Sequence, residues 1–299
     1  MTILFLFRCC LHSWISFLSL SWLYSQRKHG NRRFTRNRCR KKSEKHQWNC
    51  LQTDGSFSCD DACRIIMMKN VRRGYCEEDN VQFAGESLRT LSACAVDVIY
   101  LLNRGYPYKS VIEFAGNHYR LTQRQRNALM RMCAPDEQIA VRRNRQLQEL
   151  EEGCTVHIDG FNAVVLMETA LSGSMILKAV DGCYRDLSGL AGTYAIIEKT
   201  DPAIEMIIAS LQKHRIAKAV FWIDAPVSNS GRLKAHIAEA AEKAGLPCDI
   251  EMVRNADTEL KKHDHVISGD SEVIAECISW YNLYEELIGS LKDAWVVTL

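Results

Sequence analysis

Five aspartates in the second half of this 299-residue chain each follow a short apolar run with the pattern of a β-strand. They are Asp159 in TVHID, Asp181 in ILKAVD, Asp224 in VFWID, Asp257 in VRNAD and Asp270 in VISGD. The carboxyl ends of parallel strands meet at one edge of a sheet, where open α/β folds bind their ligands. Carboxylates gathered there repel one another unless a cation neutralises them, and hard divalent cations prefer oxygen ligands. The pattern therefore predicts a Mg²⁺ or Mn²⁺ site built from these residues.

Three of the five have the strongest local context, and we predict that Asp159, Asp224 and Asp270 are catalytic. Asp159 is followed by Gly160, which lets the backbone turn sharply, and then by Asn162, which can orient the carboxylate or a bound water. A divalent cation can activate water and stabilise charge on a phosphoryl oxygen, which suits hydrolysis of phosphate esters. Asp is also a favoured turn and helix N-cap residue, and that simpler explanation applies to each position taken singly.

Polar side chains around the same edge could hold an anionic substrate. The run after Asp224 carries hydroxyl and amide groups that could cap a helix or contact a phosphate. A glycine-rich stretch after Asp181 could be a lid or a binding loop, and it contains an arginine. The substrate-binding residues predicted at this edge are Asn162, Arg185, Ser228, Asn229 and Ser230.

The elements that must position these residues alternate between apolar strands and amphipathic helices. Strand-like runs cover 154–158, 175–180, 217–223, 248–253, 265–268 and 294–298, and helix-like runs cover 163–171, 203–214, 233–244 and 272–287. Such alternation indicates βαβ units and a largely parallel sheet. Residues 151–299 are therefore predicted to form a Rossmann-like, mostly parallel α/β domain.

Residues 67–150 are predicted to form a small all-helical domain. Apolar residues recur there at helical spacing, and Thr122 with Gln125 makes a capping-box pattern at the start of one helix. Two short helices joined by GNHYR resemble a helix-turn-helix unit. Arginines of the second helix, Arg124 and Arg126 among them, could bind nucleic-acid phosphates. The alternative is a solvated helix face made of good helix formers.

Residues 1–66 differ from the rest in composition, with 12 of the 38 Lys and Arg, 4 of the 36 Asp and Glu and 6 of the 13 Cys. An apolar stretch at 3–24 precedes a basic run, as in a membrane anchor with a cytoplasmic flank, but Arg8 and His12 interrupt it. A patterned sequence begins near Met67, so we expect a leader that is non-native or disordered, and no stable membrane association. The cysteine spacing shows no disulfide framework, which favours the cytoplasm.

Several segments resemble known families. LLNRGYPYKSVIEFAGNHYRLTQRQRNALMR, IDGFNAVVLMETALSG, VDGCYRDLSG and WIDAPVSNSG look like prokaryotic proteins of domain-of-unknown-function family 434, over about residues 67–295. The second half is also similar to PIN-like and NYN-type nuclease domains, which place an acid after the first strand and more acids after later strands. Asp159 with Asn162, Asp224 and Asp270 match that layout. The resemblance implies a PIN-like fold and Mg²⁺- or Mn²⁺-dependent cleavage of RNA. The loop that holds Arg185 has no counterpart there.

The leading hypothesis is a cytoplasmic, metal-dependent ribonuclease whose helical segment positions RNA. One alternative is a non-catalytic RNA- or protein-binding module with a degenerate PIN-like fold. Another is a small-molecule phosphatase in which Arg185 and the run 228–230 hold the phosphate. The acidic balance of residues 67–299 argues against wholesale electrostatic binding of nucleic acid but allows a local basic patch.

Overall fold

The computed structural model describes residues 71–189 and 192–299. The chain divides into two compact units, Met1–Ser56 and Phe57–Leu299, and every described residue belongs to the second. The expectations for residues 1–66 lie outside the described ranges. Within those ranges, no helix has the length and apolar character needed to cross a membrane.

The first described segment is helical, as the sequence predicts. Its helices are α3 (Asp79–Gln82), α4 (Gly85–Asn103), α5 (Tyr108–His118), α6 (Gln123–Met132) and α7 (Asp136–Arg145). The predicted capping box opens α6: the Thr122 side chain accepts a hydrogen bond from the Gln125 N–H, and the Thr122 N–H donates to Gln125 Oε1 at 3.0 Å. Local sequence therefore sets where this helix begins.

The second segment forms a parallel sheet, which confirms the predicted α/β class. Among the described residues the sheet has the order β1-β8-β7-β2-β5-β6, and every pair is parallel. Its strands are β1 (Gln146–Leu147), β2 (Thr155–Asp159), β5 (Lys218–Asp224), β6 (Cys248–Val253), β7 (Val266–Ile267) and β8 (Trp280–Tyr281). The helices that connect or follow them are α8 (Gly160–Leu171), α9 (Thr200–Lys213), α10 (Ser230–Ala244), α11 (Ala256–Leu260), α12 (Ser271–Glu276) and α13 (Leu283–Gly289).

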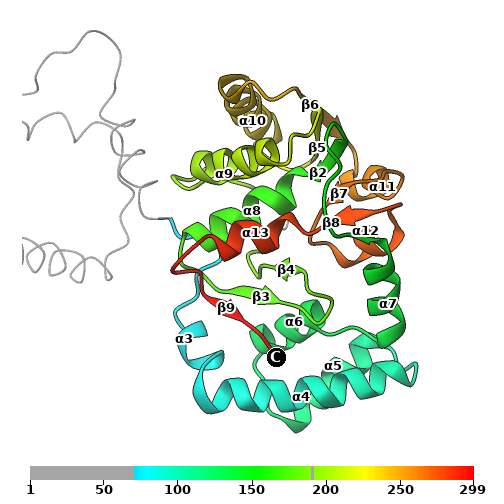
Figure 1. Ribbon diagram of the computed structural model, residues 1–299. Coiled ribbons are helices and arrows are strands. Elements are labelled where there is room, and N and C mark those ends of the chain that lie inside the picture. Colours follow the sequence, from blue (N-terminus) through cyan, green and yellow to red (C-terminus); the bar gives the residue numbers. More distant parts are fainter. Residues whose placement is uncertain (1–70, 190–191) are drawn as a thin grey trace, which may run out of the picture. The chain divides into compact units, whose positions relative to one another are not determined.

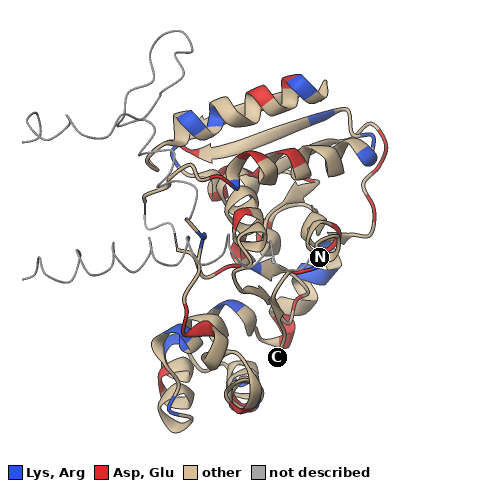
Figure 2. Ribbon diagram, turned by 90° about the vertical axis from the view of Figure 1, so that its left-hand side faces the viewer, with Lys and Arg blue, Asp and Glu red and all other residues tan. Residues whose placement is uncertain are grey.

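Helices cover both faces of this sheet (Figure 1). One apolar core joins the sheet to α8, α9, α10 and α13, and includes Ile158, Phe221 and Leu233. A smaller cluster on the other face joins the sheet to α11 and α12, and includes Trp280, which is fully buried. Charges of both signs are interspersed along the outer helix α10 (Figure 2).

The strand order reverses beside β2. After β2, the chain adds β5 and then β6 on one side, whereas β7 and β8 lie on the other side of β2. Ile158 in β2 pairs with Ile267 in β7, so Asp159 and Ser268 follow paired residues at the same edge. The carboxyl ends of these two strands therefore lie side by side where the connections diverge.

The run 175–180 does not join the parallel sheet. It forms β3 (Ile176–Lys178) in a second sheet of order β4-β3-β9, with β4 (Tyr184–Arg185) and β9 (Val296–Val297). Alternate residues Met175, Leu177 and Ala179 pack into an apolar cluster shared with α4, α5 and α6. This strand is thus held by the helical segment, and the expectation that Asp181 lies at the edge of the parallel sheet is wrong.

Candidate functional site

Asp159 occupies the point where the strand order reverses. It ends β2 and caps α8: its Oδ1 accepts a hydrogen bond from the Asn162 N–H at 3.1 Å, and its Oδ2 accepts from Ser268 Oγ at 3.0 Å. Its exposed fraction is only 6%. Burial, together with the charges of Asp257 and Asp270, raises the pKa of Asp159 to about 7. Two hydrogen bonds thus orient this carboxyl without balancing its charge.

The charges of Asp257 and Asp270 act on Asp159, and that of Asp224 acts on Asp257. Asp257 lies in the first turn of α11, and burial with the charges of Asp270 and Asp224 raises its pKa to about 6. Asp270 caps α12 through Oδ1, which accepts from the N–H groups of Glu272 at 2.8 Å and Val273 at 3.1 Å. The structure therefore places four of the five predicted acids in one interacting group.

Asp224, the last residue of β5, has a structural contact of its own. Its Oδ1 accepts a hydrogen bond from the Ala256 N–H at 2.9 Å, which ties the start of α11 to β5. This contact holds Asp257 in its place within the acidic group. Within the ranges that the structure describes, no three His, Cys, Asp or Glu residues are arranged to hold a metal ion.

A cleft of about 410 Å³ opens beside Asp270. It lies between α6, the first turn of α8 and the turn after β7, and its lining residues include Asn127, Met130, Arg131, Asn162, Arg185 and Asp270. Asn162 Oδ1 accepts hydrogen bonds from the Gly269 N–H at 2.8 Å and from the Tyr284 hydroxyl at 3.1 Å. Because a Cβ at position 269 would lie 2.7 Å from the Tyr184 carbonyl oxygen, only glycine fits this wall without a shift.

Arg185 forms the floor of the cleft and is buried. Its Nε donates to the Gly269 carbonyl at 2.8 Å, Nη1 donates to the Arg131 carbonyl at 3.0 Å, and both Nη atoms donate to Asp181. These four contacts leave one of the five guanidinium N–H groups without a partner among the described residues. Arg185 therefore holds the cleft together and keeps little donor capacity for a substrate.

Asp181 belongs to a buried ion network instead of the acidic group. Its Oδ2 lies 2.8 Å from Arg142 Nη1 and 2.6 Å from Arg185 Nη2. Burial disfavours the charged carboxylate, yet the two guanidinium groups and the Cys183 N–H together hold the pKa of Asp181 below its ordinary value. The predicted role of Asp181 as a metal ligand is therefore not supported, because Arg142 and Arg185 already neutralise its charge.

The predicted phosphate-binding arginines of α6 also make internal contacts. Arg124 pairs with buried Asp79 through Nε at 2.5 Å and Nη2 at 2.7 Å. Arg126 donates from Nε to the Leu121 carbonyl at 3.0 Å and from Nη2 to Asn117 Oδ1 at 2.9 Å. Their guanidinium groups hold the helical segment together, which accounts for them without nucleic acid.

The polar run after Asp224 anchors a loop. Ser228 Oγ accepts a hydrogen bond from the Tyr194 N–H at 3.0 Å, and Asn229 Nδ2 donates to the Tyr194 carbonyl at 2.5 Å. Ser230 Oγ donates to the Ala225 carbonyl at 3.2 Å. These contacts fasten the loop around Tyr194 to the start of α10, so the three side chains are not presented to the cleft.

Comparison with known proteins identifies relatives of this chain. Residues 90–145 match the family model described as a protein of unknown function, DUF434, and residues 147–286 match a domain of unknown function, DUF5616. The chain is 36% identical over 160 residues to the uncharacterized protein MJ0935 of Methanocaldococcus jannaschii, in an alignment that covers 53% of this chain and 76% of that protein. The chain belongs to the family of MJ0935.

The matches refine the resemblance seen in the sequence. The likeness to family 434 is confirmed for residues 90–145, but its expected extension to residue 295 is wrong because residues 147–286 match a second family model. The α/β part of this MJ0935 relative thus has a family description of its own. No solved structure matches the chain, and the similarity to PIN-like nuclease domains stays a prediction.

Sequence reasoning missed several residues that line or orient the site. Ser268 holds Asp159, and its position beside Asp270 in ISGDSE was a usable signal. Asn127, Met130 and Arg131 reach the cleft from α6. No local pattern indicates that α6 would face the turn after β7, because a tertiary contact between distant segments decides it. In this MJ0935 relative the cleft is therefore shared by the segments that match the two family models.

Proposed function

We propose that this protein is a Mg²⁺- or Mn²⁺-dependent phosphodiesterase that hydrolyses RNA at the edge formed by Asp159, Asp257 and Asp270. The observation that supports it most is the position of Asp159, which is buried at the end of β2 where the strand order reverses. Burial and the charges of nearby acids raise the pKa of Asp159 to about 7 and that of Asp257 to about 6. The order β6-β5-β2-β7-β8 is compatible with a Rossmann-like, doubly wound sheet, in which ligands bind where the order reverses. A PIN-like assignment is compatible with this order.

The donor set suits a hard cation. It consists of carboxylate oxygens, and Mg²⁺ commonly uses one or two carboxylates while water and substrate phosphate complete its coordination. A site with fewer than three protein ligands is consistent with the arrangement of the described residues. Asp159 and Asp257 would hold the cation, which when bound would neutralise their repulsion and lower the pKa of a water molecule.

The side chains themselves have separable tasks. The Ser268 hydroxyl holds one oxygen of the Asp159 carboxyl, and the backbone N–H of Asn162 holds the other. Asp270 lines the cleft and uses Oδ1 to cap α12, and its Oδ2 has no hydrogen bond to a described residue. Asp270 Oδ2 is therefore the oxygen placed to accept a proton from an attacking water.

The opposite wall supplies contacts for a polyanion. Arg131 lines the cleft from α6 and makes no ion pair with the residues that the structure describes. Its guanidinium can bind a phosphate in the bidentate manner typical of arginine. Met130 is half exposed beside it and offers an apolar surface for a base. One strand of RNA would thus lie between α6 and the acidic edge.

The small-molecule phosphatase has less support. That hypothesis rests on Arg185 and the run 228–230 as phosphate ligands, and the structure commits these side chains to protein partners. A non-catalytic binding module would have the same cleft, so only a measurement of turnover distinguishes it from the proposed phosphodiesterase.

The test is cleavage of end-labelled single-stranded RNA by the full chain in Mn²⁺. Wild type should cleave, EDTA should stop it, and Asp159→Asn should show no product above background. Asp293→Asn, an exposed acid outside the site, is the matched control and should keep full activity. RNA that binds the wild type without being cut would instead identify a binding module.

A further inference from the structure

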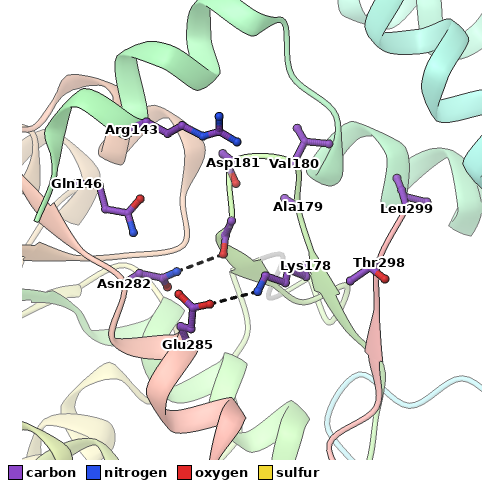
Figure 3. A pocket seen from close by; sticks show the side chains of 11 residues that line it. Arg143, Gln146, Lys178, Ala179, Val180, Asp181, Asn282, Glu285, Thr298 and Leu299 are labelled. Carbon is purple, nitrogen blue, oxygen red and sulfur yellow. Dashed lines mark hydrogen bonds and ion pairs between the residues drawn. The ribbon is translucent and has the colours of Figure 1, made fainter. Parts of the chain in front are cut away.

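A second cavity lies away from the acidic edge (Figure 3). Its volume is about 420 Å³, and α7, the turn between β3 and β4, α13 and the residues after β9 contribute to its walls. Volumes of roughly 300–1,000 Å³ are usual for small-molecule sites. None of the acidic group Asp159, Asp257 and Asp270 lines it, so what it binds is independent of the proposed phosphodiesterase activity.

Asn282 presents an unpaired acceptor in this cavity. The residue is 7% exposed, and its Nδ2 donates to the Gly182 carbonyl at 3.2 Å. Because a carbonyl can only accept, this contact fixes the orientation of the amide and identifies the other atom as Oδ1. Asn282 Oδ1 is buried and has no hydrogen-bond partner among the described residues. Buried acceptors are almost always satisfied, so this oxygen points to a ligand with a donor.

The group that fits Asn282 Oδ1 is an amino group. Glu285 lies one helical turn further along the chain, and Figure 3 shows its carboxylate beside the Asn282 side chain. Two acceptors next to each other suit a donor with two or more N–H bonds, which can reach both oxygens. A hydroxyl group has only one hydrogen to donate.

The same cavity carries positive charge for an anionic group. Arg143 reaches in from α7 and makes no ion pair with a described residue (Figure 3). Lys178 contacts Glu285 at 3.3 Å and lies over the Tyr184 ring, 5.2 Å from its centroid. The carboxylate of Asp181, also in the wall, is already neutralised by Arg142 and Arg185. Among the side chains that line the cavity, Arg143 is therefore a cation without a counter-charge.

We propose that this cavity binds a small organic anion that carries an amino group. The anionic group lies against Arg143 and Lys178, the amino group donates to Asn282 Oδ1 and Glu285, and Val180 packs against the carbon skeleton. Two kinds of metabolite have this chemistry: a nucleoside monophosphate with an exocyclic amine, and an amino acid with a side-chain carboxylate.

Calorimetric titration of the full chain with two matched pairs of ligands tests the proposal. The probes are adenosine monophosphate against inosine monophosphate, which replaces the amine with a carbonyl, and L-glutamate against glutarate, which lacks the amine. We expect one aminated ligand to bind, and its partner to bind at least about tenfold more weakly, since the partner leaves Asn282 Oδ1 unpaired. Which pair responds identifies the source. No binding by either aminated ligand, or equal binding within the responding pair, would overturn the proposal.

Two variants connect binding to these residues. Arg143→Gln should weaken the responding ligand at least about tenfold without lowering the melting temperature, since Arg143 is exposed. The matched control is Arg232→Gln on the outer face of α10, which should bind as wild type does. Asn282→Leu should abolish binding. Because it also removes the 3.2 Å hydrogen bond to the Gly182 carbonyl, the melting temperature of the free variant is measured to show that it is folded. Wild-type affinity in either cavity variant contradicts the assignment.

Discussion

Two buried aspartates in this protein follow strand-like runs and have opposite surroundings. Asp181 lies against Arg142 and Arg185, and its pKa is held below the ordinary value. Asp159 has hydrogen bonds from an N–H and a hydroxyl but other acids as its charged neighbours, and its pKa rises to about 7. A balanced buried acid holds a structure together, whereas an unbalanced one stores repulsion that a ligand can relieve.

The largest effect is expected from removing the charge of Asp181, the aspartate that is balanced by two arginines. Asp181→Asn leaves two buried guanidinium groups without a counter-charge, and we expect it to lower the free energy of unfolding by about 3–5 kcal/mol. Urea denaturation followed by circular dichroism measures this loss. The control Asp249→Asn removes an exposed partner of Lys218 and should change the same free energy by less than about 1 kcal/mol. An equal loss of unfolding free energy in the two variants would mean that the buried ion network stabilises the fold no more than an exposed ion pair does.

The second prediction concerns how pH acts on the two acids. Because the pKa of Asp159 is raised from 3.8 to about 7 on folding, its contribution to stability is present below pH 3.8 and lost as the pH rises through 7. The rise of the pKa from 3.8 to about 7 corresponds to a loss of roughly 4 kcal/mol. In EDTA, Asp159→Asn should therefore gain stability over wild type between pH 4 and 8. If the free energy of unfolding depends on pH in the same way in both proteins, burial and the neighbouring acids do not destabilise the Asp159 carboxylate.

Asp181 should behave in the opposite sense. Its folded pKa is lowered, so its contribution is present above the ordinary value of 3.8 and disappears as the pH falls through the lower folded value. As the pH falls below 4, the free energy of unfolding should therefore decrease less steeply in Asp181→Asn than in wild type, because the variant has no Asp181 carboxylate to protonate. The same pH dependence of the free energy of unfolding in both proteins below pH 4 would contradict a stabilising ion network around Asp181.

A smaller effect sharpens the geometry of the acidic edge. Gly269→Ala brings a Cβ to 2.7 Å from the Tyr184 carbonyl oxygen, and the forced shift should cost about 1–3 kcal/mol of unfolding free energy. Gly231→Ala in α10 meets nothing within 4 Å and should stabilise by up to about 1 kcal/mol. Thermal unfolding of both variants gives the comparison. A neutral Gly269→Ala would show that the turn after β7 yields easily.

The aspartates also show what the sequence alone could predict. The parallel sheet and the helical first segment follow from apolar periodicity, and the link between Asp159 and Asn162 follows from their spacing as a helix cap. Asp181 has the same local signature as Asp159, a strand and then Asp-Gly. Asp181 takes a different position because the apolar residues of β3 pack on α4–α6, and because Arg142 and Arg185 pair with its carboxylate. Local patterns cannot distinguish these outcomes because tertiary contacts settle them.

The cleft shows the same limit. Asn162 and Gly269 are 107 residues apart and meet through a single hydrogen bond. The arginines of α6 looked equivalent in sequence, yet Arg124 and Arg126 are bound internally and Arg131 faces the cleft. Helix periodicity predicts which residues are exposed but not which exposed residue meets another element.

The most direct test is calorimetric titration of Mn²⁺ into the full chain at about pH 6, for wild type, Asp159→Asn and Asp293→Asn. We expect wild type and Asp293→Asn to bind Mn²⁺ at the acidic edge and to release protons, because the Asp159 carboxyl, with a pKa of about 7, is mostly protonated at this pH before the cation binds. Asp159→Asn should lose that binding. Equal Mn²⁺ affinity in Asp159→Asn and wild type, or no binding by wild type, would contradict the claim that the unbalanced acids form a cation site.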